Sequence, residues 1–176
     1  GQYIFAGSNQ FDNVVKTLVS DKDSRRASMV ILGNEHLFAD TKDVPCTYAL
    51  NFRIRNNKLN MSVHMRSQDA IFGMTNDCPA FSFIHEMIYN TMLRYYPEIE
   101  YGSYHHIADS FHVYERHFKM LENLTGIDIE TKEKKKDWSP DPLIEIQCPK
   151  ISGPDEVDFL RKLDFSEIPD KFRFTK

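Results

Sequence analysis

The hydrophobic pattern in the first part of the chain predicts a helix, a strand and a hairpin, in that order. Apolar residues recur at helical spacing over residues 11–18, and a polar turn ends this stretch. A short, largely apolar run at residues 27–32 is typical of a buried strand. Residues 47–65 alternate between apolar and polar side chains around Asn56-Asn57, so they predict a β-hairpin that turns at the two asparagines.

The pattern then changes from strand to helix. Residues 66–77 contain polar side chains and a glycine, which predict a loop after the hairpin. Pro79 suits the first position of a helix, and the apolar stripe that follows it ends before Pro97, so we expect a long, mostly buried helix between the two prolines. A third helix is expected over residues 110–124, with Gly126 as its C-terminal cap.

Together these elements predict a single α+β domain. Helices and strands mix without a regular strand–helix–strand alternation, and the sequence lacks the glycine-rich motifs of dinucleotide and nucleoside-triphosphate sites. The length of 176 residues suits one domain. The proline-rich C-terminal part adds one further predicted strand, at residues 143–147.

Charge and cysteine content exclude several classes of protein. The chain has 22 Lys and Arg against 26 Asp and Glu, a net charge of -4, so we expect no nucleic-acid partner, and local cations must hold any anionic ligand. No apolar run approaches the roughly 20 residues that a membrane helix needs. Three scattered cysteines favour a reducing compartment and the N-terminus shows no signal-peptide pattern, so we expect a cytoplasmic protein.

Cys46 is a candidate nucleophile because it follows Pro45 where a loop enters the hairpin. Most cysteines are small buried hydrophobes, and a reactive thiolate needs cations nearby. Arg25, Arg26 and Arg66 are the candidates, each at the end of a predicted strand, and guanidinium groups are suited to binding phosphate. Spacing alone favours the alternative that these arginines pair with neighbouring aspartates on the surface.

Several histidines are candidates for polar contacts rather than for a metal site. His112 and Tyr114 could both hold a sugar hydroxyl, although a structural role for His112 is the alternative that the spacing favours. His112 and His117 are five residues apart and do not share a helical face, so we expect no metal site. His105 and His106 are adjacent and are expected to point apart.

In chain order, these motifs resemble those of thymidylate synthase and related pyrimidine-nucleotide hydroxymethylases. The matching segments are Asp23-Ser24-Arg25-Arg26, Pro45-Cys46, Arg66-Ser67-Gln68-Asp69 with Gly73 four residues on, and His112-Val113-Tyr114. The resemblance implies a thymidylate synthase-like α+β fold in which a mixed sheet packs with helices. It also implies that residues 1–176 form one catalytic domain, without the family's N-terminal segment that carries a catalytic glutamate.

The resemblance implies a role for each matching residue around a pyrimidine nucleoside monophosphate. Cys46 is the expected nucleophile that adds to C6 of the base. Arg66 and Ser67 are expected to bind the phosphate, and Arg25 and Arg26 are expected to join them from the other subunit of a homodimer. The co-substrate implied is 5,10-methylenetetrahydrofolate, and neither a metal nor a membrane is expected to take part.

Further residues are expected around the sugar and the base. His112 and Tyr114 match the pair that holds the sugar 3'-hydroxyl. Asp69 falls where an aspartate lines the base pocket, and Asn51 falls where the family has a glutamine near the nucleophile.

Asp77 is the informative departure from thymidylate synthase. Counting without a gap from Arg66, Asp77 occupies the position of the asparagine that reads uracil, and residues 72–77 resemble the deoxycytidylate hydroxymethylases of bacteriophages. A carboxylate accepts from the cytosine amino group, whereas it would face uracil O4 acceptor to acceptor. Spacing alone would make Asp77 a helix N-cap before Pro79, and a one-residue slip would place Asn76 at the reading position.

The resemblance therefore implies C5 hydroxymethylation of dCMP, with Cys46 and Asp77 as the catalytic residues, by an enzyme of virus-infected cells. Three alternatives remain open: reductive methylation of dUMP by a thymidylate synthase, hydroxymethylation of CMP, and a catalytically inactive relative that only binds nucleotide.

Overall fold

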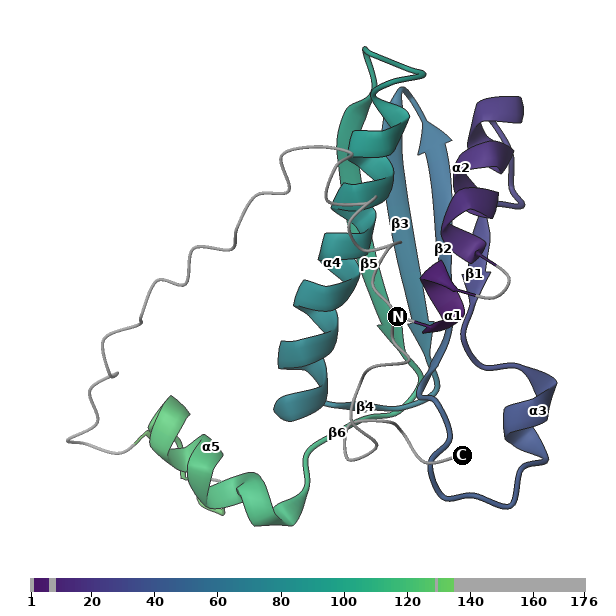
Figure 1. Ribbon diagram of the computed structural model, residues 1–176. Coiled ribbons are helices and arrows are strands. Elements are labelled where there is room, and N and C mark those ends of the chain that lie inside the picture. Colours follow the sequence, from purple (N-terminus) through teal and green to yellow (C-terminus); the bar gives the residue numbers. More distant parts are fainter. Residues whose placement is uncertain (1, 7–8, 129, 135–176) are drawn as a thin grey trace, which may run out of the picture.

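A computed structural model describes residues 2–6, 9–128 and 130–134 of the chain. A mixed four-stranded sheet in the order β1-β2-β3-β5 has helices α2 and α4 on one face, and a two-stranded sheet pairs β4 with β6 (Figure 1). The elements in chain order are α1 (Gln2–Phe5), α2 (Gln10–Ser20), β1 (Ser28–Val30), α3 (Asn34–Leu37), β2 (Thr47–Arg55), β3 (Lys58–Met65), β4 (Gln68–Asp69), α4 (Phe72–Met92), β5 (Glu100–Ala108), β6 (Phe111–His112), the 3-10 turn η1 (Glu115–His117) and α5 (Phe118–Thr125).

The predicted hairpin is confirmed as β2 and β3. Asn56 and Asn57 have positive φ angles of 50° and 60°, the left-handed conformation that two-residue hairpin turns require and that asparagine tolerates. The antiparallel register runs from Arg55 opposite Lys58 to Thr47 opposite Met65. β5 then adds to β3 in parallel, which makes the sheet mixed and confirms the expected α+β class.

The core lies between the sheet and the two helices. The alternation along the hairpin turns every second side chain of β2 and β3 toward α2 and α4, where they are buried. The fully buried large side chains from these elements are Phe11, Leu18, Leu50, Phe52, Ile54, Leu59, Met61, Met65, Met87, Ile88 and Met92. The amphipathic helix predicted over residues 11–18 and the strand predicted within residues 27–32 are thus confirmed as α2 and β1.

The predicted start of the long helix is wrong, because α4 begins at Phe72 and contains Pro79. The polar residues that suggested a loop instead form side-chain hydrogen bonds to backbone carbonyls at the start of the helix. Thr75 Oγ1 donates to Ile71 O, and Asn76 Nδ2 donates to Phe72 O. Asp77 therefore lies inside the helix and is not its N-cap.

The prediction for residues 110–124 is wrong in its first half. Phe111–His112 is the short strand β6, and α5 begins only at Phe118. Strand β5 was not predicted, because its pairing with β3 is a long-range contact that leaves no local pattern. Gly126 does cap α5, with a φ of 68° and an N–H that donates to Glu122 O, so that prediction is confirmed.

Two further predictions concern other parts of the chain. The strand expected at residues 143–147 lies outside the described residues. Within the described ranges, every helix is too short or too polar to traverse a lipid bilayer.

Candidate active site

One end of the sheet gathers most of the residues that the sequence singled out. The start of β2 meets the end of β3, where Thr47 pairs with Met65, and the end of β5 lies beside them, where Met65 pairs with Ala108. Beyond this end of the sheet, β4 and β6 pair in parallel and place Asp69 next to His112. Cys46, Arg66, Asp69 and His112 therefore share this end, at the bottom of the view in Figure 1.

Arg66 holds the loop that presents Cys46. The backbone N–H of Arg66 donates to Cys46 O at 2.8 Å, while its guanidinium donates from Nε to Pro45 O at 3.1 Å and from Nη2 to Val44 O at 2.8 Å. A guanidinium has five N–H groups, so three remain for an anionic ligand. Cys46 itself is a free and exposed thiol. The nucleophile candidate and a cation are thus adjacent in the fold.

Asp69 performs the capping role that the sequence assigned to Asp77. Its carboxylate accepts from the backbone N–H groups of Ile71, Phe72 and Gly73, which are free at the start of a helix. Desolvation acts to raise the pKa of Asp69, but these hydrogen bonds and the nearby His117 outweigh it and lower the pKa. Asp69 is therefore fixed in its ionised form between the nucleophile loop and α4.

Asp77 faces the neighbouring strand β4 from the first part of α4. Gln68, which is 1% exposed, donates from Nε2 to Asp77 Oδ2 at 3.1 Å. The preceding Asn76 is exposed and uses its amide on the carbonyl of Phe72. Of these two neighbours, Asp77 is the residue that turns toward β4, the strand of Gln68 and Asp69 that follows Arg66 and Ser67.

Sequence reasoning missed a group of polar side chains behind Asp77. His106 lies between Gln68 and Tyr104, and it bonds to Gln68 Oε1 at 3.2 Å through Nε2 and to the Tyr104 hydroxyl through Nδ1. Burial lowers the pKa of His106, and burial together with the nearby Cys78 raises the pKa of Tyr104 well above its usual value. Both side chains are therefore neutral at physiological pH.

The only sequence signal for this group was the pair His105-His106. The two histidines do point apart as predicted, since His105 is exposed and contacts the Ser103 hydroxyl at 2.8 Å. Nothing in the sequence linked His106 to Gln68, because the two residues meet only when β4 lies beside β5.

His112 and Tyr114 lie close together at the same end of the sheet. Their rings contact edge to face with centroids 5.0 Å apart. The Arg116 guanidinium lies 4.4 Å from the Tyr114 ring centroid, and Tyr114 remains 45% exposed. Both polar tips can therefore reach a ligand beside Asp69.

Three predicted site residues do not join this group. Asn51 lies on the sheet face away from the helices, where its Oδ1 accepts from Ser28 Oγ at 2.8 Å. Arg25 and Arg26 precede β1, which runs antiparallel to β2. Arg26 therefore lies level with Arg53, about 20 Å along the sheet from Cys46.

The aspartates near the arginines have other partners. Asp23 forms an ion pair with Arg55 at 3.7 Å, and Asp69 uses its oxygens on backbone N–H groups. Asp21 accepts from the backbone N–H of Asp23. Within the described residues, none of Asp21, Asp23 and Asp69 forms an ion pair with Arg25, Arg26 or Arg66. No three His, Cys, Asp or Glu side chains within these described ranges are arranged to hold a metal ion.

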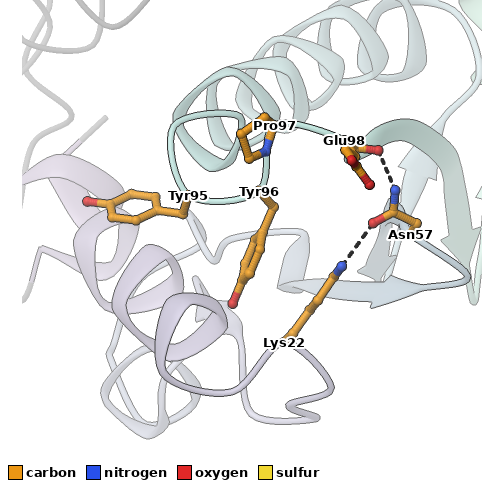
Figure 2. Close-up of a pocket in the computed structure, with 6 residues that line it drawn as sticks. All are labelled: Lys22, Asn57, Tyr95, Tyr96, Pro97 and Glu98. Carbon is orange, nitrogen blue, oxygen red and sulfur yellow. Dashed lines mark hydrogen bonds between the residues drawn. The ribbon is translucent and has the colours of Figure 1, made fainter.

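A separate pocket lies at the opposite end of the sheet, beside the hairpin turn (Figure 2). Its polar groups tie elements together: Lys22 Nζ donates to Asn57 Oδ1 at 2.9 Å, and the Tyr96 hydroxyl donates to Leu18 O at 3.0 Å. The Asn57 amide also donates to the Glu98 carbonyl. Since these groups are satisfied within the protein, we interpret this pocket as a structural junction.

Two features together define a thymidylate synthase-like domain: the mixed sheet with its helices on one face, and Cys46 and Arg66 at the ends of its two central strands. The thymidylate synthase family matches residues 5–138, and the chain therefore belongs to that family.

Several curated proteins are similar to the chain. It is 35% identical over 140 residues to the deoxyuridylate hydroxymethyltransferase of Bacillus phage SP01, which covers 74% of this chain and 35% of the relative. It is 32% identical over 137 residues to the deoxycytidylate 5-hydroxymethyltransferase of Enterobacteria phage T6, covering 73% of this chain and 54% of the relative. A putative thymidylate synthase of Methanocaldococcus jannaschii is 31% identical over 110 residues, or 60% and 47% of the two chains. The chain thus spans between about a third and about half of these relatives.

Proposed function

We propose that the protein is a one-carbon transferase that hydroxymethylates C5 of dCMP, with 5,10-methylenetetrahydrofolate as the one-carbon donor and water as the source of the hydroxyl. The observation that carries the choice of base is the Asp77 carboxylate, which is held by Gln68 in strand β4, next to Asp69 and two residues after Arg66. The choice of chemistry is supported by relatives that are named as hydroxymethyltransferases.

The proposed reaction begins at Cys46. Its thiolate forms a bond to C6 of the base, and the electron pair moves to C5, which attacks the methylene carbon of the folate. Loss of the C5 proton and departure of tetrahydrofolate leave an exocyclic methylene on the nucleotide. Water adds to that carbon, the thiolate leaves C6, and the products are 5-hydroxymethyl-dCMP and tetrahydrofolate.

The proposed binding of the nucleotide uses the cations and the ring pair described above. Arg66 has three N–H groups that its backbone contacts do not use, and Ser67 follows it directly, so both would contact the phosphate. His112 and Tyr114 would hold the sugar hydroxyl. Since Arg25 and Arg26 are distant from Cys46 within one chain, we propose that they complete the phosphate site of a partner subunit in a homodimer.

The proposed role of Asp77 is to recognise the cytosine edge. Its Oδ1 makes no hydrogen bond within the described part of the chain and would accept from the amino group at C4. Uracil presents a carbonyl at that position, so a carboxylate would face it without a proton between them. A mismatched buried group costs about 1–3 kcal/mol, which gives roughly tenfold to hundredfold discrimination.

Hydroxymethylation of dUMP is the second candidate, because the similar protein of Bacillus phage SP01 is named for deoxyuridylate. The two candidates share the Cys46 chemistry and differ at the base edge. Since several relatives come from bacteriophages, we propose that the protein is virus-encoded and acts in the cytoplasm of the infected host.

The test is to offer dCMP, CMP and dUMP separately to the whole protein with 5,10-methylenetetrahydrofolate, and to weigh the nucleotide product. We expect a hydroxymethyl product from dCMP and no rise in dihydrofolate absorbance, which would appear only if hydride were transferred. A product from dUMP alone would support the second candidate, and a methyl product with dihydrofolate would identify a thymidylate synthase. No product, together with no covalent complex on a 5-fluoropyrimidine nucleotide and folate, would mean a binding protein without activity.

A further inference from the structure

A continuous series of hydrogen bonds runs from β5 through β4 to α4 and ends on Asp77. Gln68 Nε2 contacts Asp77 Oδ2 at 3.1 Å, Gln68 Oε1 contacts His106 Nε2 at 3.2 Å, and His106 Nδ1 contacts the Tyr104 hydroxyl. Cys78 Sγ lies at the end of the series, 4.0 Å from the Tyr104 oxygen and 3.7 Å from His106 Nδ1. The series connects three elements that are far apart in sequence.

Chemistry determines the direction of the bonds that run from Asp77 through Gln68 and His106 to Tyr104. A carboxylate only accepts, so Gln68 must turn its NH2 group toward Asp77 and its carbonyl oxygen toward His106. The neutral imidazole then carries its proton on Nε2 and leaves Nδ1 to accept from the Tyr104 hydroxyl. The alternative orientation of the Gln68 amide would oppose two acceptors at Asp77.

Packing also restricts the Gln68 side chain. Gly73 lies in the first turn of α4, and a Cβ atom added there would be 2.8 Å from Gln68 Nε2 and 3.3 Å from the Asp69 Cβ. The backbone of Gly73 does not need a positive φ, since Gly126 is the described glycine with that conformation. Glycine at position 73 is therefore needed because it leaves space for the Gln68 amide, and not because the backbone there requires a left-handed conformation.

We propose that Gln68 is the positioning residue that decides which side-chain atom of residue 77, the group that reads the base, faces the nucleotide. Because Gln68 presents a fixed N–H, the acceptor atom of residue 77 faces Gln68, and the other atom faces the base. With aspartate that other atom is an acceptor suited to the amino group of cytosine, whereas with asparagine it is an NH2 group suited to uracil O4. This inference rests on the proposed function, since it assumes that position 77 contacts the base.

The test is a double-mutant cycle on nucleotide binding. Wild type, Gln68→Met, Asp77→Asn and the double variant are titrated with dCMP and with dUMP by calorimetry, and the ratio of the two dissociation constants is compared. Gln68→Met alone should change the preference for dCMP by less than about twofold, because both oxygens of the Asp77 carboxylate accept whichever one faces the base. Asp77→Asn alone should reverse the preference, whereas the double variant should bind both nucleotides about equally because its amide is free to turn.

The nucleotide-free protein provides a second readout that does not depend on the substrate. The ¹⁵N chemical shifts of His106 should show the proton on Nε2 in the wild type and a mixture of both tautomers in Gln68→Met. Gln10→Met is the matched control, because Gln10 also loses hydrogen bonds, to Tyr3 and Val30, at a place remote from Asp77. This control should leave both the preference and the His106 tautomer unchanged.

Gly73→Ala keeps the inference testable if Gln68→Met does not fold. It removes no polar group but crowds the Gln68 amide, and combined with Asp77→Asn it should make the binding of dCMP and dUMP about equal, as Gln68→Met does in the double variant. Additive effects in the cycle, or a His106 tautomer that does not respond to Gln68→Met, would overturn the role of Gln68. A different outcome would separate the two proposals. If the wild type binds dUMP as tightly as dCMP but the His106 tautomer does respond to Gln68→Met, cytosine is the wrong base and the orienting role of Gln68 still holds.

Discussion

Replacement of His85 with phenylalanine tests how a buried imidazole supports the parallel strand that carries the polar series behind Asp77. His85 lies on α4 and is fully buried, and its Nε2 donates to the Leu59 carbonyl at 2.9 Å. That carbonyl needs a donor because the pairing of β3 with β5 shifts register between Leu59 and Met61. Gly102 lies against the same carbonyl, where a Cβ atom would approach to 2.4 Å.

Phenylalanine keeps the ring shape and its packing on Tyr101, whose ring centroid lies 4.4 Å from that of His85, but it cannot donate a hydrogen bond. The Leu59 carbonyl would then be buried without a partner, at a cost of about 1–3 kcal/mol. The substitution also removes His85 Nδ1, which is buried and unpaired within the described structure. We therefore expect a net loss of about 1–2 kcal/mol in the free energy of unfolding at pH 8.

The loss should depend on pH in a defined direction. Burial lowers the pKa of His85 below its ordinary value of 6.5, so the unfolded chain takes up a proton that the folded chain does not as pH falls through this region. Wild type is thereby destabilised below about pH 6.5, whereas the phenylalanine variant lacks this effect. The difference between the two proteins should shrink as the solution is acidified.

Urea denaturation followed by circular dichroism, at one protein concentration and at pH 8 and pH 5.5, measures both effects. Gly102 and Leu59 remain unchanged, so the comparison measures the loss of the Nε2 donor together with the removal of the unpaired Nδ1. Equal stability of the two proteins at pH 8 would refute the role of the hydrogen bond, and a difference that does not change with pH would refute the depressed pKa of His85.

Three further predictions concern the proposed site. Cys46→Ser should abolish turnover but leave nucleotide binding intact, as measured by product mass and by calorimetry; lost binding with an unfolded spectrum would mean a structural cysteine. Arg26→Ala and Cys46→Ser should each be inactive alone and regain part of the activity when their subunits are mixed and allowed to exchange, which would not happen if each site lay within one chain. Asp69→Asn should lower the thermal midpoint at neutral pH, because a neutral amide is a weaker acceptor for the helix N–H groups. This difference should begin to shrink as pH falls through the ordinary value of 3.8 and should disappear only below the lowered pKa of Asp69 in the folded protein.

The sequence alone determined the elements whose causes are local. Two adjacent asparagines in an alternating stretch are sufficient for a hairpin, and apolar residues at helical spacing are sufficient for α2. The order of short motifs around Cys46, Arg66 and His112 likewise pointed to the thymidylate synthase family, because each motif is contiguous in the chain.

The start of α4 depended on a residue that local patterns did not single out. Asp69 precedes the helix by three residues and accepts three of its free N–H groups, and this allows the helix to begin well before Pro79. The polar residues Thr75 and Asn76 resembled a loop in sequence because the carbonyls that they bond are visible only once the helix exists.

Only the tertiary structure decided how the candidate site is assembled. Strand β5 places His106 against Gln68 through a pairing between segments about 40 residues apart, and it is this pairing that gives the Gln68 amide its orientation toward Asp77. The same sheet places Arg25 and Arg26 away from Cys46, although all three belong to one ordered set of motifs. A chain pattern records which side chains are present and how they alternate, whereas the direction of a hydrogen bond and the distance between two strand ends depend on how the segments pack.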